Sequence, residues 1–243
     1  MTPPARVAVV TGASRGLGAM IAGFLSSEGF ALVLTARGGA ALSERLLSLR
    51  APGRPVEGVV GDVSDPAHRR EIRQAVDRLG GRVDLLVNNA SELGPSPLRP
   101  LVEVEVGDLA RVYATNVAAP IALVAELGPA LRRGHGLIVN ITSDAAVGAY
   151  ARWGPYGASK AALELATRTL AVELREWGVS AVVVDPGDLR TAMHQAAFPG
   201  EDISDRPLPE VTLPFWAWLL GQDPSAVNGG RFRAQADRWE LPA

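Results

Sequence analysis

The hydrophobic pattern of the chain alternates between two periods. Short runs of β-branched and aliphatic residues are separated by longer segments in which leucine and alanine return every three or four positions. A short apolar run is typical of a strand buried in a parallel sheet, and the longer period is typical of a helix that covers such a sheet. The runs predict strands at 6–11, 31–37, 56–61, 83–88, 136–142, 179–185 and 229–235.

Helical segments lie between these strands. Asp65 followed by Pro66 predicts a helix start, because the aspartate can cap free backbone N–H groups and proline has the backbone angle of a first turn. Helices are expected in a segment ending at Gly29, at 40–50, in a segment starting at Pro66, and at 105–132, 154–177 and 215–221.

The alternation of strand and helix predicts an α/β fold. We expect a doubly wound parallel sheet of about seven strands between two layers of helices, in a three-layer α/β/α arrangement. No repeat, low-complexity segment or linker divides the chain, so a single domain over residues 1–243 is expected. Residues 192–214 mix prolines with apolar and acidic residues without a clear period, which predicts a substrate lid.

A glycine-rich turn follows the first strand. It reads TGASRGLG at 11–18 and leads directly into a helix, so free backbone N–H groups at the helix N-terminus can bind a phosphate. Gly12 allows the tight turn, and Gly16 and Gly18 allow the backbone and a ligand to approach closely. Glycine triplets alone are weak signals, but the order strand, turn, helix predicts a dinucleotide site.

The end of the second strand indicates which dinucleotide is bound. An acidic residue there would accept hydrogen bonds from ribose hydroxyls and repel a 2′-phosphate, but Ala36 and Arg37 occupy the place. Arg37 alone could equally be a solvated strand-end residue. With Arg15 and Ser14 in the glycine turn, however, two guanidiniums and a hydroxyl can pair with a 2′-phosphate, which favours NADP(H) over NAD(H).

Two further strand ends carry candidate ligand contacts. Asp62 and Val63 end the third strand, where an adenine ring can lie. Asn88 and Asn89 end the fourth strand and precede Ala90, at the edge where parallel sheets bind ligands. Asparagines at a strand end can also simply organise a turn.

The chemistry of the chain concentrates at residues 140–160. The fifth strand delivers Ser143, and Tyr156 and Lys160 stand four positions apart, so on a helix they share one face. An ammonium beside a phenol favours the phenolate and lowers the pKa of the tyrosine from about 10. These residues predict general acid–base catalysis near neutral pH.

Asn116 and Pro120 interrupt the long helix expected at 105–132. Pro120 has no backbone N–H to donate to the carbonyl of Asn116, so the helix is expected to loosen there. The freed carbonyl and the amide could hold a water. From these residues alone, a solvent-facing asparagine beside a tolerated kink is the preferred interpretation.

Composition narrows the class of protein. Lys and Arg total 24 against 26 Asp and Glu, a net charge of −2, so nucleic acid and an anionic membrane surface are not expected partners. The cysteine count is zero, which excludes disulfides and thiolate metal sites, and no metal is expected. The N-terminal stretch MTPPARVAVVTGAS has the pattern of neither a signal peptide nor a membrane span, so we expect a cytoplasmic protein. The share of hydrophobic residues, 47%, is ordinary for a soluble enzyme with a substantial core.

From about residue 6 to 235 the sequence resembles the short-chain dehydrogenase/reductase family, whose domain is a Rossmann fold. The resemblance rests on the combination and order of TGASRGLG at 11–18, NNA at 88–90, Asn116, Ser143, YGASK at 156–160 and PGDLRT at 186–191. One departure is Ser91, because the family usually has glycine after NNA. That substitution predicts a different loop shape beside the cofactor.

The resemblance implies a role for each matched residue. Tyr156 would exchange a proton with the substrate oxygen, Lys160 would lower the tyrosine pKa and bind the ribose, and Ser143 would hydrogen-bond the carbonyl. Asn116 would hold a water for proton resupply, which replaces the solvent-facing interpretation. The resemblance implies substrate contacts at Ser143 and Tyr156, and Trp153 is expected to add one by its apolar side chain. With Arg37, cofactor contacts are expected at Gly12, Ser14, Arg15, Gly16, Leu17, Gly18, Asp62, Val63, Asn89, Ala90, Tyr156, Lys160, Pro186, Gly187, Leu189 and Thr191.

These observations predict NADPH-dependent reduction of a ketone or aldehyde, or the reverse oxidation of a secondary alcohol. An NAD-dependent alcohol dehydrogenase is the related alternative, and a non-catalytic NADPH-sensing protein is the alternative of another class. The substrate is expected to be a modest-sized apolar carbonyl compound, and the family resemblance implies a homodimer or homotetramer. Candidate pocket residues, each as easily explained by packing, are Leu93, Trp153, Met193, Phe198 and Trp216.

Overall fold

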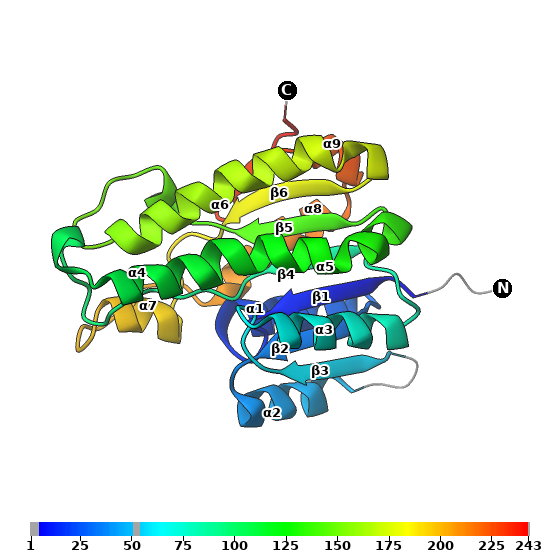
Figure 1. Cartoon of the computed structure of the whole chain (residues 1–243), viewed down its shortest axis with the longest axis horizontal. Coiled ribbons are helices and arrows are strands. Elements are labelled where there is room, and N and C mark those ends of the chain that lie inside the picture. Colours follow the sequence, from blue (N-terminus) through cyan, green and yellow to red (C-terminus); the bar gives the residue numbers. More distant parts are fainter. Residues whose placement is uncertain (1–4, 51–53, 243) are drawn as a thin grey trace.

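A seven-stranded sheet in which every neighbouring pair is parallel forms the centre of the computed structural model, which describes residues 5–50 and 54–242 (Figure 1). The strand order is β3-β2-β1-β4-β5-β6-β7, which confirms the predicted doubly wound sheet. The strands are β1 (Val7–Thr11), β2 (Ala31–Ala36), β3 (Val56–Val60), β4 (Leu85–Asn88), β5 (Leu137–Ile141), β6 (Ser180–Asp185) and β7 (Arg231–Arg233). The first four residues of the N-terminal stretch lie outside the described residues.

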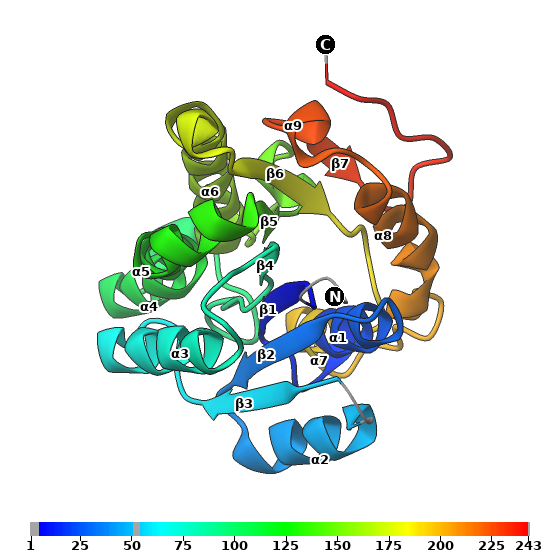
Figure 2. The same cartoon turned by 90° about the vertical axis from the view of Figure 1, so that its right-hand side faces the viewer.

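Helices cover both faces of the sheet, as predicted for three layers (Figure 2). Successive strand residues point to opposite faces, so Val10 packs with helices α1 and α8 while Val9 packs with α3, α5 and α6. Asp65 caps α3 by accepting a hydrogen bond from the backbone N–H of Ala67 (2.8 Å), as its sequence predicts. The helices are α1 (Gly16–Ser27), α2 (Gly39–Leu49), α3 (Pro66–Arg78), α4 (Val106–Tyr113), α5 (Ala119–Gly134), α6 (Gly154–Glu173), α7 (Ala192–Ala197), α8 (Leu213–Leu220) and α9 (Pro224–Val227).

The chain crosses from one half of the sheet to the other between β1 and β4. Strand β1 is hydrogen-bonded to β2 on one side and to β4 on the other, and connections from these strands leave in opposite directions. At such a switch point a crevice opens beyond the carboxyl ends of the strands, which is where open α/β sheets bind ligands. The glycine-rich turn that follows β1 and the two asparagines at the end of β4 both lie beside this crevice.

The helix expected at 105–132 is divided by one π-helical turn at 114–118, between α4 and α5. Pro120 follows this turn, and the widened backbone there confirms the predicted loosening. Asn116 lies inside the turn and is fully buried. The solvent-facing interpretation of Asn116 was therefore wrong, because the turn directs its side chain towards the protein.

The combined helical segment 106–134 is long and apolar enough to cross a membrane by length and composition alone, with a mean hydropathy of 1.3 over its most apolar window. Half of that window is buried inside the protein. Leu123, Leu127 and Leu131 pack in the core between the sheet and the helices on this face. This burial is that of a core helix.

The segment predicted as a lid has two parts with different packing. Residues Ala192–Ala197 form α7, whose first turn is capped by the hydroxyl of Thr191, which accepts from the N–H of His194 (3.2 Å). A short turn, Pro209–Thr212, instead packs against α1, and Thr212 is fully buried. Helix α7 is the part that lies beside the ligand crevice.

Candidate active site

One cavity of about 530 Å³ runs across the carboxyl end of the sheet. It extends from the ends of β2 and β3, past the glycine-rich turn, to the N-terminus of α6 and to α7. Nearly every residue expected to contact a cofactor or substrate lines it. The predicted residues in its wall are Gly12, Ser14, Arg15, Gly16, Leu17, Arg37, Asp62, Val63, Asn89, Ala90, Ser143, Trp153, Tyr156, Lys160, Pro186, Gly187, Leu189 and Thr191.

The glycine-rich turn fits a phosphate-bearing ligand. Gly12 and Gly16 have φ of 66° and 57°, which side-chain-bearing residues rarely adopt. Helix α1 starts at Gly16 with no side chain capping its N-terminus, so its first backbone N–H groups are free to bind an anion. The turn is held by Asn89, whose amide donates to the carbonyl oxygens of Thr11 (2.9 Å) and Gly12 (3.2 Å).

Gly18 has a different role from the one expected. It is buried and lies outside the cavity wall, so it does not approach the ligand. A Cβ atom at this position would collide with the carbonyl oxygen of Gly12 and with the amide of Asn89. Gly18 is therefore needed for close packing of the helix against its own turn.

The end of the cavity between the glycine-rich turn and the end of β2 has the charges expected for a 2′-phosphate. Arg15 and Arg37 both line it, and Ala36 stands where an acidic residue would exclude the phosphate. Arg37 is 63% exposed and makes one ion pair, to Glu92 at 3.4 Å. Asp62 accepts from the N–H and hydroxyl of Ser64 (2.8 and 2.7 Å), and these bonds lower the pKa of the carboxyl although burial raises it.

Tyr156 and Lys160 lie on one face of α6 near its N-terminus, and both are buried. The ammonium nitrogen of Lys160 lies 5.4 Å from the centre of the phenol ring and donates to the carbonyl oxygen of Ile141 (2.8 Å). Burial lowers the pKa of Lys160 to about 7. The predicted geometry of the pair is therefore present.

The predicted direction of the tyrosine pKa is wrong for this arrangement. Burial raises the pKa of Tyr156 above its ordinary value, and the charge of Asp185 raises it further. The hydroxyls of Ser91 and Ser143 lower the pKa of Tyr156 by hydrogen bonding, but they do not outweigh burial. Burial also lowers the pKa of Lys160, so the lysine is less fully protonated near neutral pH and supports a phenolate less than the spacing suggests.

Ser143 follows β5 and begins a short turn at Asp144–Ala146. Its hydroxyl donates to the Asp144 carboxylate (3.0 Å) and accepts from the N–H of Ala145 (3.2 Å). The carbonyl oxygen of Ser143 accepts a bond from the Arg231 guanidinium (3.2 Å). The backbone of this turn is thus supported from β7, at the far edge of the sheet.

Arg231 is half-buried and belongs to a polar cluster around the buried Glu164 that the sequence did not reveal. It pairs with Glu164 at 3.0 Å, and the hydroxyl of Thr142 donates to the same carboxylate oxygen (2.8 Å). Glu164 stands four residues after Lys160, so it continues the face of α6 that carries the tyrosine and the lysine. The spacing of four residues from Lys160 could have identified Glu164 as a residue near the site. It gave no indication that an arginine 67 residues later would pair with this carboxylate.

Asn116 does not line the cavity, and both its amide oxygen and its amide nitrogen are hydrogen-bonded within the protein. Its oxygen accepts from the N–H of Glu92 (2.7 Å) and the hydroxyl of Ser91 (3.1 Å). Its nitrogen donates to the carbonyl oxygen of Glu92 (2.8 Å) and to the hydroxyl of Ser159 (2.9 Å). This side chain therefore braces the loop after β4 against α6.

The substrate end of the cavity has an apolar wall. Trp153 packs edge-on against Tyr156 at 5.7 Å between ring centres and against Phe198 at 6.2 Å, and Leu93 and Met193 complete the wall. Trp216, the other aromatic candidate, does not reach the cavity. It is fully buried in the core on the α1 face of the sheet, where its indole donates to Thr212 (3.2 Å).

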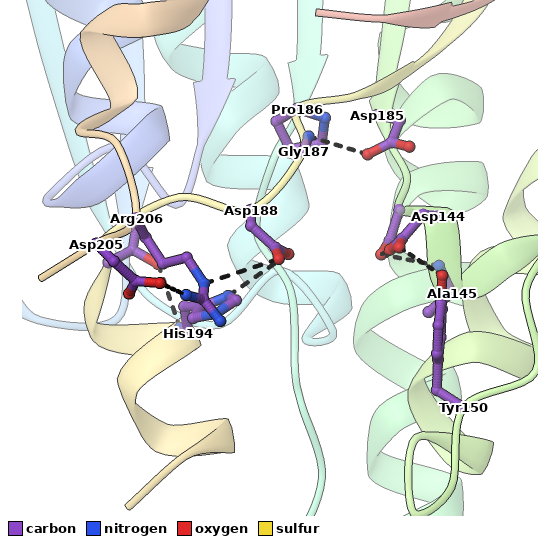
Figure 3. A network of polar contacts seen from close by, with 12 residues as sticks. Asp144, Ala145, Tyr150, Asp185, Pro186, Gly187, Asp188, His194, Asp205 and Arg206 are labelled. Carbon is purple, nitrogen blue, oxygen red and sulfur yellow. Dashed lines mark hydrogen bonds and ion pairs between the residues drawn. The ribbon is translucent and has the colours of Figure 1, made fainter. Parts of the chain in front are cut away.

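Polar residues that were not predicted from the sequence line the outer part of the substrate end of the cavity. Figure 3 shows Asp188 with His194 and Arg206 as one group and Asp144 with Tyr150 as another. The Tyr150 hydroxyl donates to Asp144 (2.8 Å), and His194 lies 3.9 Å from the Asp188 carboxylate. Asp144 follows Ser143 directly, so its place beside the site could have been inferred. Among residues 5–50 and 54–242, no group of His, Cys, Asp and Glu side chains is arranged to hold a metal ion.

Known proteins with similar sequences and structures share this arrangement of elements. A family model described as short chain dehydrogenase matches residues 6–202. The rhamnolipids biosynthesis 3-oxoacyl-(acyl-carrier-protein) reductase of Pseudomonas aeruginosa is 34% identical over 194 residues, covering 77% of this chain and 74% of that protein. The 2,3-dihydro-2,3-dihydroxybenzoate dehydrogenase of Bacillus subtilis is 31% identical, over 81% of this chain and 75% of that protein.

A solved structure extends the similarity over the whole fold. A protein from Escherichia coli CFT073, crystallised with NADPH, superposes with a TM-score of 0.86 at 29% identity. The superposition covers 95% of this chain and 97% of the other.

Proposed function

The chain belongs to the short-chain dehydrogenase family of oxidoreductases, and we propose that it reduces a ketone or aldehyde with NADPH, with Tyr156 as the proton donor. The observation that carries the proposal is the position of the Tyr156 phenol. The phenol lines the cavity that begins at the glycine-rich turn, together with Ser143, and the ammonium nitrogen of Lys160 lies 5.4 Å from its ring centre.

Bound NADPH would supply a hydride to the carbonyl carbon of the substrate. Tyr156 donates its phenolic proton to the carbonyl oxygen, and the hydroxyl of Ser143 turns from Asp144 to stabilise the charge that develops there. Lys160 has a pKa of about 7, so it releases and regains a proton near neutral pH and suits resupply of the tyrosine.

A panel of carbonyl compounds tests this function. The purified protein is expected to oxidise NADPH, followed by absorbance, in the presence of reactive diketones, aryl ketones or a β-ketoacyl thioester. The apolar wall of Trp153, Phe198 and Leu93 favours modest-sized apolar or aromatic compounds over sugars. Two relatives are named for a 3-oxoacyl-(acyl-carrier-protein) and for 2,3-dihydro-2,3-dihydroxybenzoate, so a 3-oxoacyl compound is tested with NADPH and a cyclic dihydrodiol is tested in the oxidative direction with NADP+. Tight NADPH binding without turnover of any member would instead favour a sensing protein.

We further propose that NADP(H) is preferred over NAD(H). The support is the pair Arg15 and Arg37, with Ala36 in place of a carboxylate, and the E. coli neighbour that binds NADPH. Replacement of either arginine by alanine is expected to weaken NADPH binding about five- to tenfold, because an exposed charge-assisted bond to phosphate is lost. The binding of NADH, which has no such phosphate, is expected to change less than twofold.

Fluorescence titration of both cofactors measures this difference. Arg132→Ala, which removes an exposed arginine from the last turn of α5, is the matched control and is expected to change neither constant. Equal losses for NADPH and NADH, or equal affinity of the parent protein for both, would contradict the preference and favour an NAD-dependent alcohol dehydrogenase.

A homodimer or homotetramer is proposed from exposed apolar residues on the two long helices. Leu165 and Val172 on α6, and Val106 at the start of α4, are 60%, 69% and 80% exposed. Apolar side chains that recur on one helix face are typical of contacts with another subunit.

A further inference from the structure

The hydroxyl of Ser143 depends on its own turn for its position. It donates to the carboxylate of Asp144 (3.0 Å) and accepts from the backbone N–H of Ala145 (3.2 Å), and both partners stand within two residues of the serine. These partners move with Ser143 whenever the turn moves. The distance from this hydroxyl to the Tyr156 phenol is therefore set by the contacts that hold the turn as a whole.

The turn packs closely on the helix that carries Tyr156. A Cβ atom placed on Gly157, the next residue of α6, would lie 2.5 Å from the carbonyl oxygen of Ala145. On the other side the chain enters the turn from the sheet, where the backbone N–H of Thr142 donates to the carbonyl oxygen of Val184 (2.8 Å). A small shift of the turn beyond Thr142 therefore changes how Ser143 faces the phenol.

A contact from a distant strand reaches the turn at Ser143 itself. The carbonyl oxygen of Ser143 accepts from the N–H of Ala146 inside the turn (3.1 Å) and from the Arg231 guanidinium on β7 (3.2 Å). Arg231 is placed by the parallel pairing of β7 with β6, where it lies opposite Val183. The bond therefore ties the turn that bears Ser143 to the far edge of the sheet.

The same guanidinium also joins α6 and the end of β6. Its Nε donates to the carboxylate of Glu164 at 3.0 Å, and Glu164 stands four residues after Lys160 on α6. Its Nη2, the nitrogen that bonds Ser143, lies 3.7 Å from the carboxylate of Asp185. Both carboxylate side chains are 5% exposed, which favours pairing with a cation, and a planar guanidinium can serve several acceptors at once.

We propose that Arg231 is a positioning residue, which holds the turn that bears Ser143 in place against the helix that bears Tyr156. The inference rests on the proposed carbonyl reduction, in which Ser143 stabilises the charge on the substrate oxygen. Arg231 does not line the cavity, so it acts through Ser143 and not by contact with the substrate. Loss of the guanidinium releases the turn, and the serine hydroxyl leaves the place where the substrate oxygen receives its proton.

A double-mutant cycle of Arg231→Met with Ser143→Ala tests this route, using NADPH and a carbonyl substrate found active in the panel. Arg231→Met alone is expected to lower kcat about ten- to hundredfold, because a misplacement of about 1 Å can cost about hundredfold. KM and the NADPH dissociation constant should stay within about twofold. In the Ser143→Ala enzyme, which has no hydroxyl left to place, the added Arg231→Met should lower kcat by less than about twofold. Product formed in long incubations at high enzyme concentration measures the slow variants.

A conservative variant and a matched control accompany the cycle. Arg231→Lys keeps a positive charge beside the two carboxylates but not the planar fork, so its kcat should lie between those of the parent and Arg231→Met. If thermal unfolding shows that Arg231→Met does not fold, the cycle is run with Arg231→Lys. Arg233→Met is the control, because this exposed arginine of β7 has no side-chain hydrogen bond or ion pair among residues 5–50 and 54–242. It should leave kcat and NADPH binding unchanged.

Parent-like kcat in Arg231→Met would overturn the inference and leave the proposed function standing. A loss of kcat that multiplies with the loss in Ser143→Ala would show a route that bypasses the serine, and it would overturn the inference as well. NADPH binding that weakens in parallel with kcat would assign Arg231 to the stability of the whole site, with the same consequence. A parent enzyme inactive on the whole panel would remove both proposals.

Discussion

Tyr156→Phe is expected to lower kcat for carbonyl reduction by about two to four orders of magnitude, the range that a positioned general acid contributes. The substitution removes one oxygen and leaves the buried ring in place against Trp153. The fold and the cofactor end of the cavity should therefore persist, and the dissociation constant of NADPH should change little. Steady-state rates and NADPH fluorescence, measured on the same preparation, separate these two effects.

Tyr113→Phe is the control for Tyr156→Phe. Tyr113 ends α4 and lies outside the cavity wall, so removal of its hydroxyl should leave kcat at the parent value. A Tyr156→Phe enzyme that keeps full activity would contradict the assignment of the proton donor, because no other phenol lies beside both Ser143 and Lys160 in the described part of the chain.

Gly18→Ala should disable cofactor binding although Gly18 does not face the cavity. The added methyl group would meet the Gly12 carbonyl oxygen and the Asn89 amide, so the turn that binds the phosphate has to move. Overpacking of this kind costs roughly 1–3 kcal/mol. We expect the NADPH dissociation constant to rise at least about tenfold, the equivalent of 1.4 kcal/mol, and the midpoint of thermal unfolding to fall.

Gly107→Ala is the control, because it adds the same methyl group at a position where no neighbouring atom lies close to it. A Cβ atom at Gly107 has open space around it, and the residue lies in the first turn of α4, where alanine is a better helix former than glycine. This variant should bind NADPH like the parent and unfold at the same or a higher temperature. If Gly18→Ala behaves in the same way, the close packing of α1 on its turn does not control cofactor binding.

The sheet and most of the cavity wall could be predicted because their signals are local. A buried parallel strand is a continuous apolar run, and most candidate cofactor residues follow the end of such a run. The pairing of Tyr156 with Lys160 depends only on helix periodicity. Even the loosening at Pro120 follows from the chemistry of one residue, a missing N–H.

The features that were missed depend on residues far apart in the chain. The burial that raises the pKa of Tyr156 comes from surrounding elements that no spacing reveals. Trp216 was a plausible pocket residue by type, but the packing of α8 on the α1 face decides its place. Ser91 could be recognised as unusual from sequence, whereas its contact with Asn116, 25 residues later, needed the fold.

The bond between Arg231 and the carbonyl oxygen of Ser143 has a consequence for how the enzyme is made. Glu164 and the turn that bears Ser143 are synthesised well before β7, and their cationic partner belongs to the last strand of the sheet. During synthesis the turn that bears Ser143 therefore lacks this support until residue 231 has left the ribosome and docked.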